Sequence, residues 1–148
     1  MKRIRIIAAA ILFLLSGTVL VHAKGAGIEW DILNREVKEL HRQGKYERAV
    51  VLAQKTLEVA MANVGPDHPD VATSLNNLGL LYGTQGEYAK AEPLYKRSLA
   101  ISEKALGPDN PNVTGSLENM AYMYRKMKRD KDAAALEARA ARIRAIKR

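Results

Sequence analysis

The sequence of 148 residues contains no cysteine, one phenylalanine and one tryptophan. Without cysteine, the chain can form no disulfide, no thiolate metal site and no cysteine nucleophile. Alanine, leucine, lysine and arginine are abundant and favour helices, whereas the aromatic and β-branched residues that favour strands are scarce. The length fits one domain, so the composition predicts a single all-α domain.

The sequence also lacks the motifs that mark many enzymes. It contains no phosphate-binding loop, nucleophile elbow or dinucleotide-binding glycine pattern. Its three histidines, His22, His41 and His68, have no ligand-like partners at short spacing, which argues against a metal site. We therefore expect a non-catalytic protein with no metal, no cofactor and no small-molecule substrate.

Positive charge is concentrated at the two ends of the chain, whose formal net charge is +8. Residues 125–148 hold ten basic and three acidic residues, whereas residues 24–124 hold 11 basic and 13 acidic residues. The basic C-terminus allows three interpretations: a solvated last helix, a contact with an anionic membrane or envelope surface, or nucleic-acid binding. The absence of aromatic residues after Tyr124 argues against nucleic acid.

Residues 1–23 have the three-part pattern of a secretory signal. A short basic start precedes an apolar run over residues 6–21, and Ala23 ends a Val-His-Ala sequence that suits a signal peptidase. We predict cleavage after Ala23 and a periplasmic or secreted protein, which also argues against nucleic acid. The alternative is a retained membrane anchor. However, the run has 16 residues and contains Gly17, whereas a spanning helix needs about 20 apolar residues.

A period of 42 residues runs through the rest of the chain. Gly-Pro-Asp-His-Pro at residues 65–69 recurs as Gly-Pro-Asp-Asn-Pro at residues 107–111. Gly-Glu-Tyr-Ala-Lys-Ala at residues 86–91 has a weaker counterpart, Gly-Lys-Tyr-Glu-Arg-Ala, at residues 44–49. Repeats of this length indicate a helical solenoid. The three copies cover residues of about 24–64, 65–106 and 107–148.

Each copy is predicted to form two helices. In the middle copy, Gly86 ends the first helix and a second apolar stripe follows it. One helix pair cannot bury its apolar face alone, so stacked pairs share a core and about three are needed for stability. The stripe of the first helix has spacings of four, three and four residues. It consists of Val71, Leu75, Leu78 and Tyr82.

The repeated Gly-Pro-Asp segment is expected to start the second and third copies. Asp67 and Asp109 can cap the first backbone N–H groups, and the proline two residues later fits the first turn, where its missing N–H costs nothing. The first copy lacks this segment, and its helix is expected to begin near Ile28. The buried stripe expected for that helix consists of Trp30, Leu33, Val37 and Leu40.

The middle copy resembles the tetratricopeptide repeat in its 42-residue, kinesin-light-chain-like form. The resemblance covers the mature chain and is strongest for residues 65–106. It implies an all-α solenoid of about three antiparallel helix pairs that binds a protein or peptide. The residues that carry it are Leu75, Leu78, Gly79 and Tyr82 in the first helix and Ala91, Tyr95 and Ser98 in the second.

The first and third copies depart from the family pattern. Glu36 stands at the place of Leu78, and Glu137 stands at the place of Tyr95. Polar residues where another repeat would pack are typical of the end of an array. We therefore expect Leu78 to be buried, Glu36 to be exposed and the array to stop after the third copy. Self-association stays open, because Ile143 and Ile146 keep the last helix partly apolar.

The resemblance implies that the first helices of successive repeats line a concave groove. Asn77 and Asn119 recur where the family uses asparagine to hold a peptide main chain, and an amide can donate and accept at once. Basic residues at both ends of the groove imply an acidic partner segment. The implied groove residues are Asn34, Arg35, Lys38 and Arg42 in the first copy, Asn76, Asn77 and Leu80 in the second, and Glu118, Asn119, Tyr122, Arg125 and Lys126 in the third.

Two functional classes fit the sequence. The first is a non-catalytic adaptor or scaffold of the bacterial cell envelope that binds a segment of another protein in the groove. The alternative is a structural module that self-associates or binds an anionic surface through its basic C-terminal helix. In that case the working surface includes Arg139, Arg142 and Arg144, which are expected to lie away from the groove.

Overall fold

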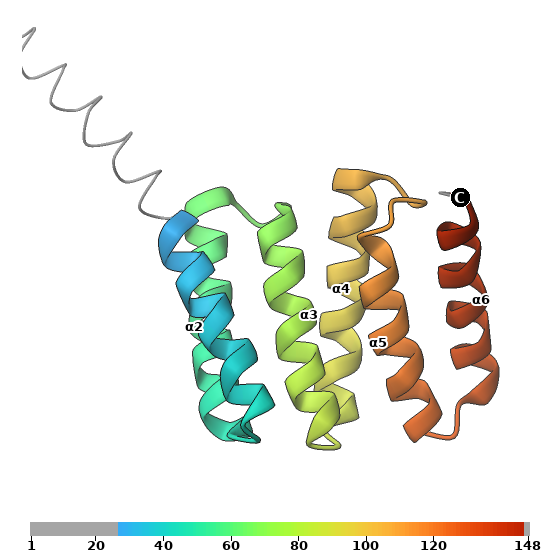
Figure 1. Ribbon diagram of the computed structural model, residues 1–148, viewed down its shortest axis with the longest axis horizontal. Coiled ribbons are helices and arrows are strands. Elements are labelled where there is room, and N and C mark those ends of the chain that lie inside the picture. Colours follow the sequence, from blue (N-terminus) through green and yellow to red (C-terminus); the bar gives the residue numbers. More distant parts are fainter. Residues whose placement is uncertain (1–26, 147–148) are drawn as a thin grey trace, which may run out of the picture.

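The computed structural model describes residues 27–146, which form six helices in three antiparallel pairs (Figure 1). The predicted all-α fold of three helix pairs is confirmed. The predicted export signal lies outside the described residues. The pairs are residues 27–42 with α2 (Tyr46–Val64), α3 (Pro69–Thr84) with α4 (Tyr88–Leu106), and α5 (Val113–Lys126) with α6 (Asp130–Ile146).

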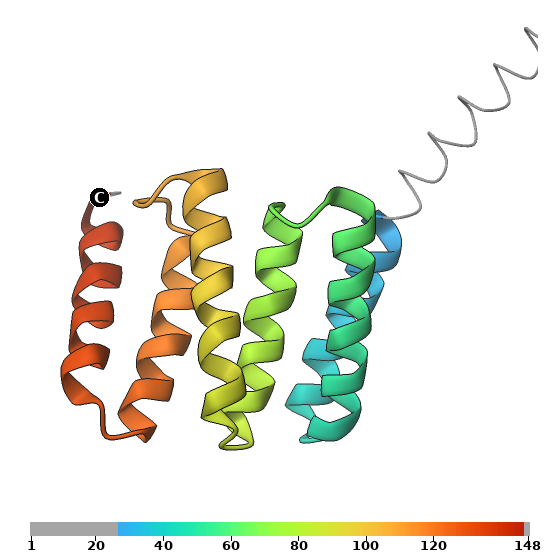
Figure 2. The ribbon, with the colours of Figure 1, turned by 180° about the vertical axis from the view of Figure 1, so that it is seen from behind.

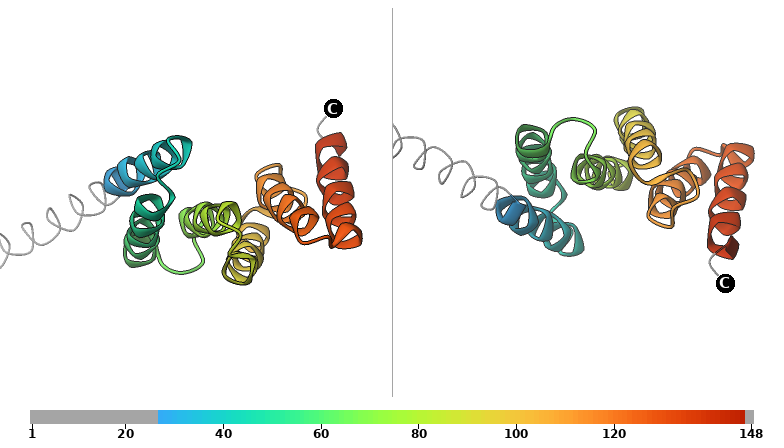
Figure 3. Two further views of the ribbon diagram at one scale, coloured as in Figure 1. Left: turned by 90° about the horizontal axis from the view of Figure 1, so that it is seen from below. Right: turned by 90° about the horizontal axis from the view of Figure 1, so that it is seen from above.

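The three pairs stand side by side in chain order (Figures 1 and 2). Seen end on, the helix of residues 27–42, α3 and α5 form one row, and α2 and α4 lie on its convex side (Figure 3). We call the first helix of each pair the inner helix, and we call α2, α4 and α6 the outer helices. The inner helices are therefore neighbours, and their exposed side chains form one surface across the array.

The turn inside each pair is built in the same way three times. One residue adopts a left-handed φ, which is 72° at Gly44, 76° at Gly86 and 60° at Lys128. The N–H of the next residue then donates to the carbonyl five residues before it, at 2.9 Å in all three turns. Glycine adopts this conformation freely, whereas a side chain costs about 1–2 kcal/mol. Lys128 is therefore a strained position in the third turn.

The starts of α3 and α5 correct a prediction, because Asp67 and Asp109 are not the capping residues. The Nδ1 atom of His68 accepts the backbone N–H two residues later, at 3.2 Å. Asn110, at the same place in the third repeat, accepts the N–H of Asn112 at 2.9 Å, and Asn112 is the N-cap residue of α5. The residue before proline is held in an extended conformation, with ψ of 148° at His68. Its side chain therefore lies beside the first turn, while Asp67 faces Lys104 of α4.

The predicted apolar stripe of α3 forms the core between the first and second pairs. Val71, Leu75 and Leu78 are all at most 4 % exposed. Leu78 packs in one cluster with Val37 of the preceding inner helix and with Leu81. The predicted burial of Leu78 is thus confirmed. Its position between two repeats makes it part of the stacking core.

The helix of residues 27–42 carries carboxylates where α3 carries buried apolar residues. Glu36 is exposed, as predicted. Of the expected stripe of this helix only Val37 is fully buried, at 2 % exposure, while the other three members are partly buried. A further repeat packed on this end would have to bury charge. At the places of Val71, Leu78 and Leu81 of α3, this helix carries Glu29, Glu36 and Glu39.

Candidate partner-binding groove

The implied groove residues lie on the three inner helices at places that recur every 42 residues. Because the inner helices are neighbours, residues at one place form a row across the array. Tyr122 is the most exposed apolar residue of the set, at 58 %. The first row contains Asn34, Asn76 and Glu118, the second Arg35, Asn77 and Asn119, and the third Lys38, Leu80 and Tyr122.

Asparagine side chains link each inner helix to the next. The Nδ2 atom of Asn77 donates to Oδ1 of Asn34 at 2.6 Å. The Nδ2 atom of Asn119 donates to Oδ1 of Asn76 at 3.3 Å. Both bonds span 43 residues, so the same contact is made at both junctions. The structure thus joins four implied groove residues as two pairs, which the sequence did not show.

These amide pairs keep hydrogen-bonding capacity for a ligand. A side-chain amide has two N–H donors and an oxygen that accepts. Asn77 and Asn119 each use one donor in the pair, and within residues 27–146 their Oδ1 atoms accept no hydrogen bond from the protein. Both side chains are partly exposed. Each amide is therefore oriented by the protein and still able to accept a backbone N–H.

Two of the implied basic residues are paired inside the protein. Arg42 donates to Glu39 at 2.9 and 2.6 Å, and this bond lowers the pKa of Glu39 to about 2. Arg125 donates to Glu137 at 2.7 Å and to Asp130 at 3.2 Å, and these bonds raise the pKa of Arg125. Both arginines therefore have their charge balanced by carboxylates of their own repeat.

The unpaired positive charge on the groove lies elsewhere. Arg35, Lys38 and Lys126 are exposed and form no ion pair with any described residue. The Nζ atom of Lys126 lies 5.2 Å from the centroid of the Tyr122 ring, within cation–π range. The groove therefore has two free cations at its first repeat and one, beside an aromatic ring, at its third.

The third repeat corrects the expectation that the distal arginines lie away from the groove. Arg144 of α6 forms an ion pair with Glu118, so its side chain reaches the inner helix α5. Arg139 pairs with Glu103 of α4 at 2.6 Å and so ties two repeats together. Arg142 makes a long contact of 3.9 Å with a carboxylate. Of the three, Arg142 is the most available to a partner.

A small hollow of about 60 Å³ opens between the helix of residues 27–42 and α3. Lys38, Asn77 and Leu80 line it together with His41, which is not among the implied groove residues. The Nε2 atom of His41 lies 3.4 Å from a hydroxyl of α3. His41 stands two repeats before Arg125. The 42-residue period could therefore have identified it.

Neither a metal centre nor a membrane span occurs in the described part of the chain. Among residues 27–146, no three His, Asp or Glu side chains are grouped so that they could hold a metal ion. None of the helices in this range is long and apolar enough to cross a membrane. The expectation that the protein needs no cofactor stays a prediction.

A family model for the tetratricopeptide repeat matches the chain twice, over residues 40–104 and 84–145. The chain belongs to the tetratricopeptide-repeat family. Together the matches cover residues 40–145, which include both members of the Asn76–Asn119 pair and Asn77 of the other pair, whereas Asn34 lies before the matched range. A search of curated proteins gave no significant match.

Solved tetratricopeptide-repeat structures have the same fold. BtubC (BKLC) from P. vanneervenii matches with a TM-score of 0.71 and 28% identity, over 79% of this chain and 47% of that one. A putative kinesin light chain from Podosopora anserina with nearly identical TPR-like repeats matches with a TM-score of 0.71 and 20% identity, over 79% and 56%. The chain thus spans about half the length of these structures. Its repeats are kinesin-light-chain-like, as predicted.

Proposed function

We propose that this tetratricopeptide-repeat array is a non-catalytic interaction module that holds an extended segment of another protein across its inner helices. Tetratricopeptide repeats in general mediate protein–protein interaction. The observation that supports this function most strongly is the repeated asparagine pair, which orients an accepting oxygen at each junction. Packed helices lie about 8–10 Å apart, and an extended peptide covers that distance in about three residues. One main chain can therefore meet both oxygens.

The free side chains of the groove favour a segment of mixed character. Arg35 and Lys38 offer two unpaired cations at the first repeat, which suits acidic residues of the partner. Leu80 is partly exposed and Tyr122 is 58 % exposed, so the third row offers apolar surface. We propose an acidic segment with at least one apolar side chain that packs beside Tyr122.

The proposed site of action is the bacterial cell envelope. This part of the proposal rests on the signal-like pattern of residues 1–23, which the structure does not describe. The mature protein is expected to begin at Lys24. Intact-mass measurement on protein recovered from the periplasm tests this expectation. A mass that still includes residues 1–23 would favour a retained membrane anchor.

A second candidate function is contact with an anionic surface through α6. Lys131 and Arg142 are exposed on this helix and support the candidate. Polybasic surfaces bind anionic lipid through charge, so this contact should weaken as salt rises. Co-sedimentation with anionic and neutral vesicles separates this candidate from the groove, because groove binding needs no lipid.

The groove function is tested by titration of a partner peptide, first captured by pulldown from an envelope extract. Asn119→Ala should weaken binding at both low and physiological salt, by about 1–3 kcal/mol, because a backbone N–H of the partner loses its acceptor. The double variant Arg35→Ala with Lys38→Ala should weaken binding mainly at low salt, because physiological salt screens charge beyond about 8 Å.

The matched control carries Lys131→Ala and Arg142→Ala on α6, which removes the same amount of charge away from the groove. Its affinity for the peptide should be unchanged. If this control loses the peptide while Asn119→Ala retains it, the groove is not the binding surface and α6 is.

A further inference from the structure

The outer helix α2 exposes an apolar side chain between charges of opposite sign. Val51 is 69 % exposed, more than any other large hydrophobic side chain in the described range. Glu47 lies one turn before it and Lys55 one turn after it, so the three residues share one face of the helix. Neither charge forms an ion pair with a residue in the range 27–146. Glu47 and Lys55 are about 12 Å apart along the axis and cannot pair within one helix.

This pattern is not a requirement of the repeat. The other outer helices have no exposed aliphatic side chain between opposite charges at these places. Packing within the repeat therefore does not explain the stripe on α2. The corresponding residues are Ala89, Pro93 and Arg97 in α4 and Lys131, Ala135 and Arg139 in α6.

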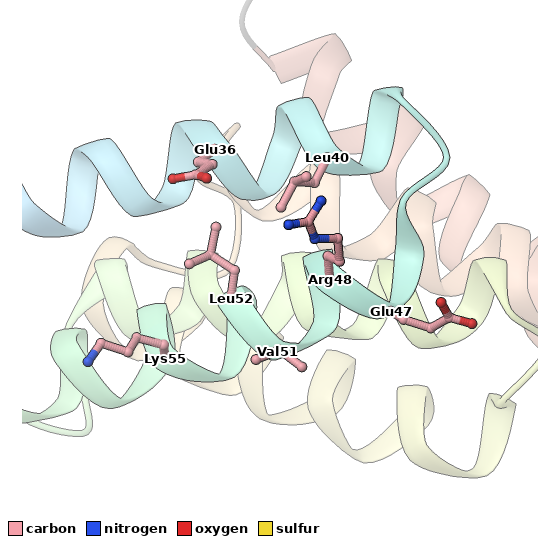
Figure 4. Close-up of a pocket in the computed structure, with 7 residues that line it drawn as sticks. All are labelled: Glu36, Leu40, Glu47, Arg48, Val51, Leu52 and Lys55. Carbon is pink, nitrogen blue, oxygen red and sulfur yellow. The ribbon is translucent and has the colours of Figure 1, made fainter.

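An open apolar hollow of about 540 Å³ lies beside Val51, between α2 and the helix of residues 27–42 (Figure 4). Leu40 and Leu52 point toward each other across it from the two helices. Glu47 lies toward one end of the hollow and Lys55 toward the other. Arg48 lies beside Leu40 in the hollow, and Glu36 lines it from the other helix. The hollow therefore has an apolar floor and a rim with both signs of charge.

We propose that this face is an interface between two copies of the chain, in which α2 packs antiparallel against the α2 of a second copy about a two-fold axis at Val51. A two-fold axis brings residues at equal distances before and after Val51 into contact. Val51 thus meets the partner's Val51, and Glu47 meets the partner's Lys55. The reciprocal contact pairs Lys55 with the partner's Glu47, and both hollows are covered.

Charge complementarity favours a second copy over other occupants. A membrane or a partner with charge of one sign would attract either Glu47 or Lys55 and repel the other. An antiparallel copy pairs both charges at once and removes Val51 from water. One helix pair makes a small interface, so we expect a weak dimer whose population rises with concentration. The dimer leaves the groove free, because α2 lies on the convex side of the inner row.

Charge reversal tests the proposal on the full chain as recovered after expression, with its N-terminus defined by intact mass. Sedimentation velocity over a range of concentrations gives the dissociation constant of the dimer. E47K and K55E should each weaken the dimer at least about tenfold, because each places like charges opposite one another twice. An equal mixture of E47K and K55E should form a mixed dimer again, because opposite charges then meet. R97E, at the corresponding place of α4, is the matched control and should leave the dimer unchanged.

The absence of cysteine in the chain allows an independent test. V51C should form a disulfide-linked dimer under mild oxidation, because the two-fold axis places the two side chains together, and K55E in the same chain should reduce the yield. Thermal melts of each variant check that it is folded. A chain that stays monomeric at every concentration overturns the proposal. So does a dimer that resists E47K and K55E, or a mixture of the two that stays monomeric.

Discussion

The two junctions between repeats use the same places with different side chains. At the first junction, the Nε1 atom of Trp30 donates to the hydroxyl of Ser74 at 2.8 Å. At the second, Ala72 stands at the place of Trp30 and Ser116 at the place of Ser74. There the hydroxyl of Ser98 lies 3.2 Å from that of Ser116, and a hollow of about 180 Å³ opens beside them. One junction is closed by an indole and the other by small hydroxyl side chains.

At a second pair of places, the large side chain belongs to the second repeat instead of the first. In the second repeat, Tyr95 is 1 % exposed and lies so close to Gly79 that a Cβ there would stand 3.0 Å from the ring. In the first repeat the same two places hold Val37 and Ala53. The second repeat thus has tyrosine opposite glycine where the first repeat has alanine opposite valine. The comparison teaches that the same places of the repeat accept side chains of different size, and that the volume packed at a junction is not constant, because the second junction keeps an open hollow.

The largest effect should come from truncation of the stacking core. Leu78→Ala should lower the free energy of unfolding by about 2–5 kcal/mol, because a buried side chain leaves a cavity. Glu36→Ala, at the same place of the first repeat, should change it by no more than about 0.5 kcal/mol. Urea denaturation of both variants measures the difference. Equal losses would show that Glu36 does not stand at an exposed edge of the array and that the register of the repeats is wrong.

The close approach of Tyr95 to Gly79 gives the next largest effect. Gly79→Ala should destabilise by about 1–3 kcal/mol, because the added Cβ meets the ring. Gly83 lies one turn later, where a Cβ would make ordinary contacts of 3.7 and 4.0 Å. Gly83→Ala should therefore stabilise by about 0.5–1 kcal/mol through helix propensity. Thermal melts of the two variants decide this, and a shift of both in one direction would contradict the packing described.

The third turn should gain stability from glycine. Lys128→Gly should stabilise by about 1–2 kcal/mol, because φ at this position is left-handed. Gly86→Ala, in the equivalent turn of the second repeat, should lose a comparable amount. Chemical denaturation compares the two turns directly. A loss of stability in Lys128→Gly would show that the lysine side chain makes a contact worth more than the backbone strain.

The smallest expected effect is the loss of stability at low pH that depends on Glu92. At the second junction Glu92 accepts from Tyr124 at 2.9 Å and from Arg129 at 3.2 Å. Bonding to Lys96 is the main cause that lowers the pKa of Glu92 below its usual 4.5. A lowered pKa in the folded state means stability that is present above pH 4.5 and is lost as the pH falls through the folded value. Glu92→Gln should remove less than about 1 kcal/mol at pH 7.

Melts of the wild type and Glu92→Gln from pH 7 to pH 3 should therefore converge as the pH falls. Glu58→Gln, an exposed change on α2, serves as the control and should follow the wild type throughout. The first junction has Val50 at the place of Glu92, so this acid sensitivity belongs to the second junction. If the stabilities of the wild type and Glu92→Gln fall in parallel with pH, protonation of Glu92 does not cause the acid sensitivity.

The 42-residue period predicted the features that depend on spacing along the chain. It predicted three helix pairs, the burial of Leu78 and the exposure of Glu36, because helix periodicity and repeat register are properties of sequence. The capping residues were predicted too early, at Asp67 and Asp109, whereas the N-cap residues are His68 for α3 and Asn112 for α5. The error arose because the cap depends on the backbone before proline, which composition alone does not show.

The contacts of the groove could not be predicted in the same way. The bonds from Asn77 and Asn119 to the preceding repeat depend on the distance and rotation between neighbouring helices. The ion pairs of Arg125 and of Arg144 connect α5 and α6, and each depends on how far a long side chain reaches. The sequence placed these residues on helices, whereas only the packed structure shows which of them already form hydrogen bonds or ion pairs within the protein.

The most direct test of the central claim is amide hydrogen exchange of the protein with and without its captured partner peptide. If the groove binds the peptide, amide exchange should slow in segments of the inner helices, which are residues 27–42, α3 and α5. Exchange in α2, α4 and α6 should be unchanged. Protection confined to α6, with the inner helices unaffected, would contradict a groove that binds a partner across the repeats.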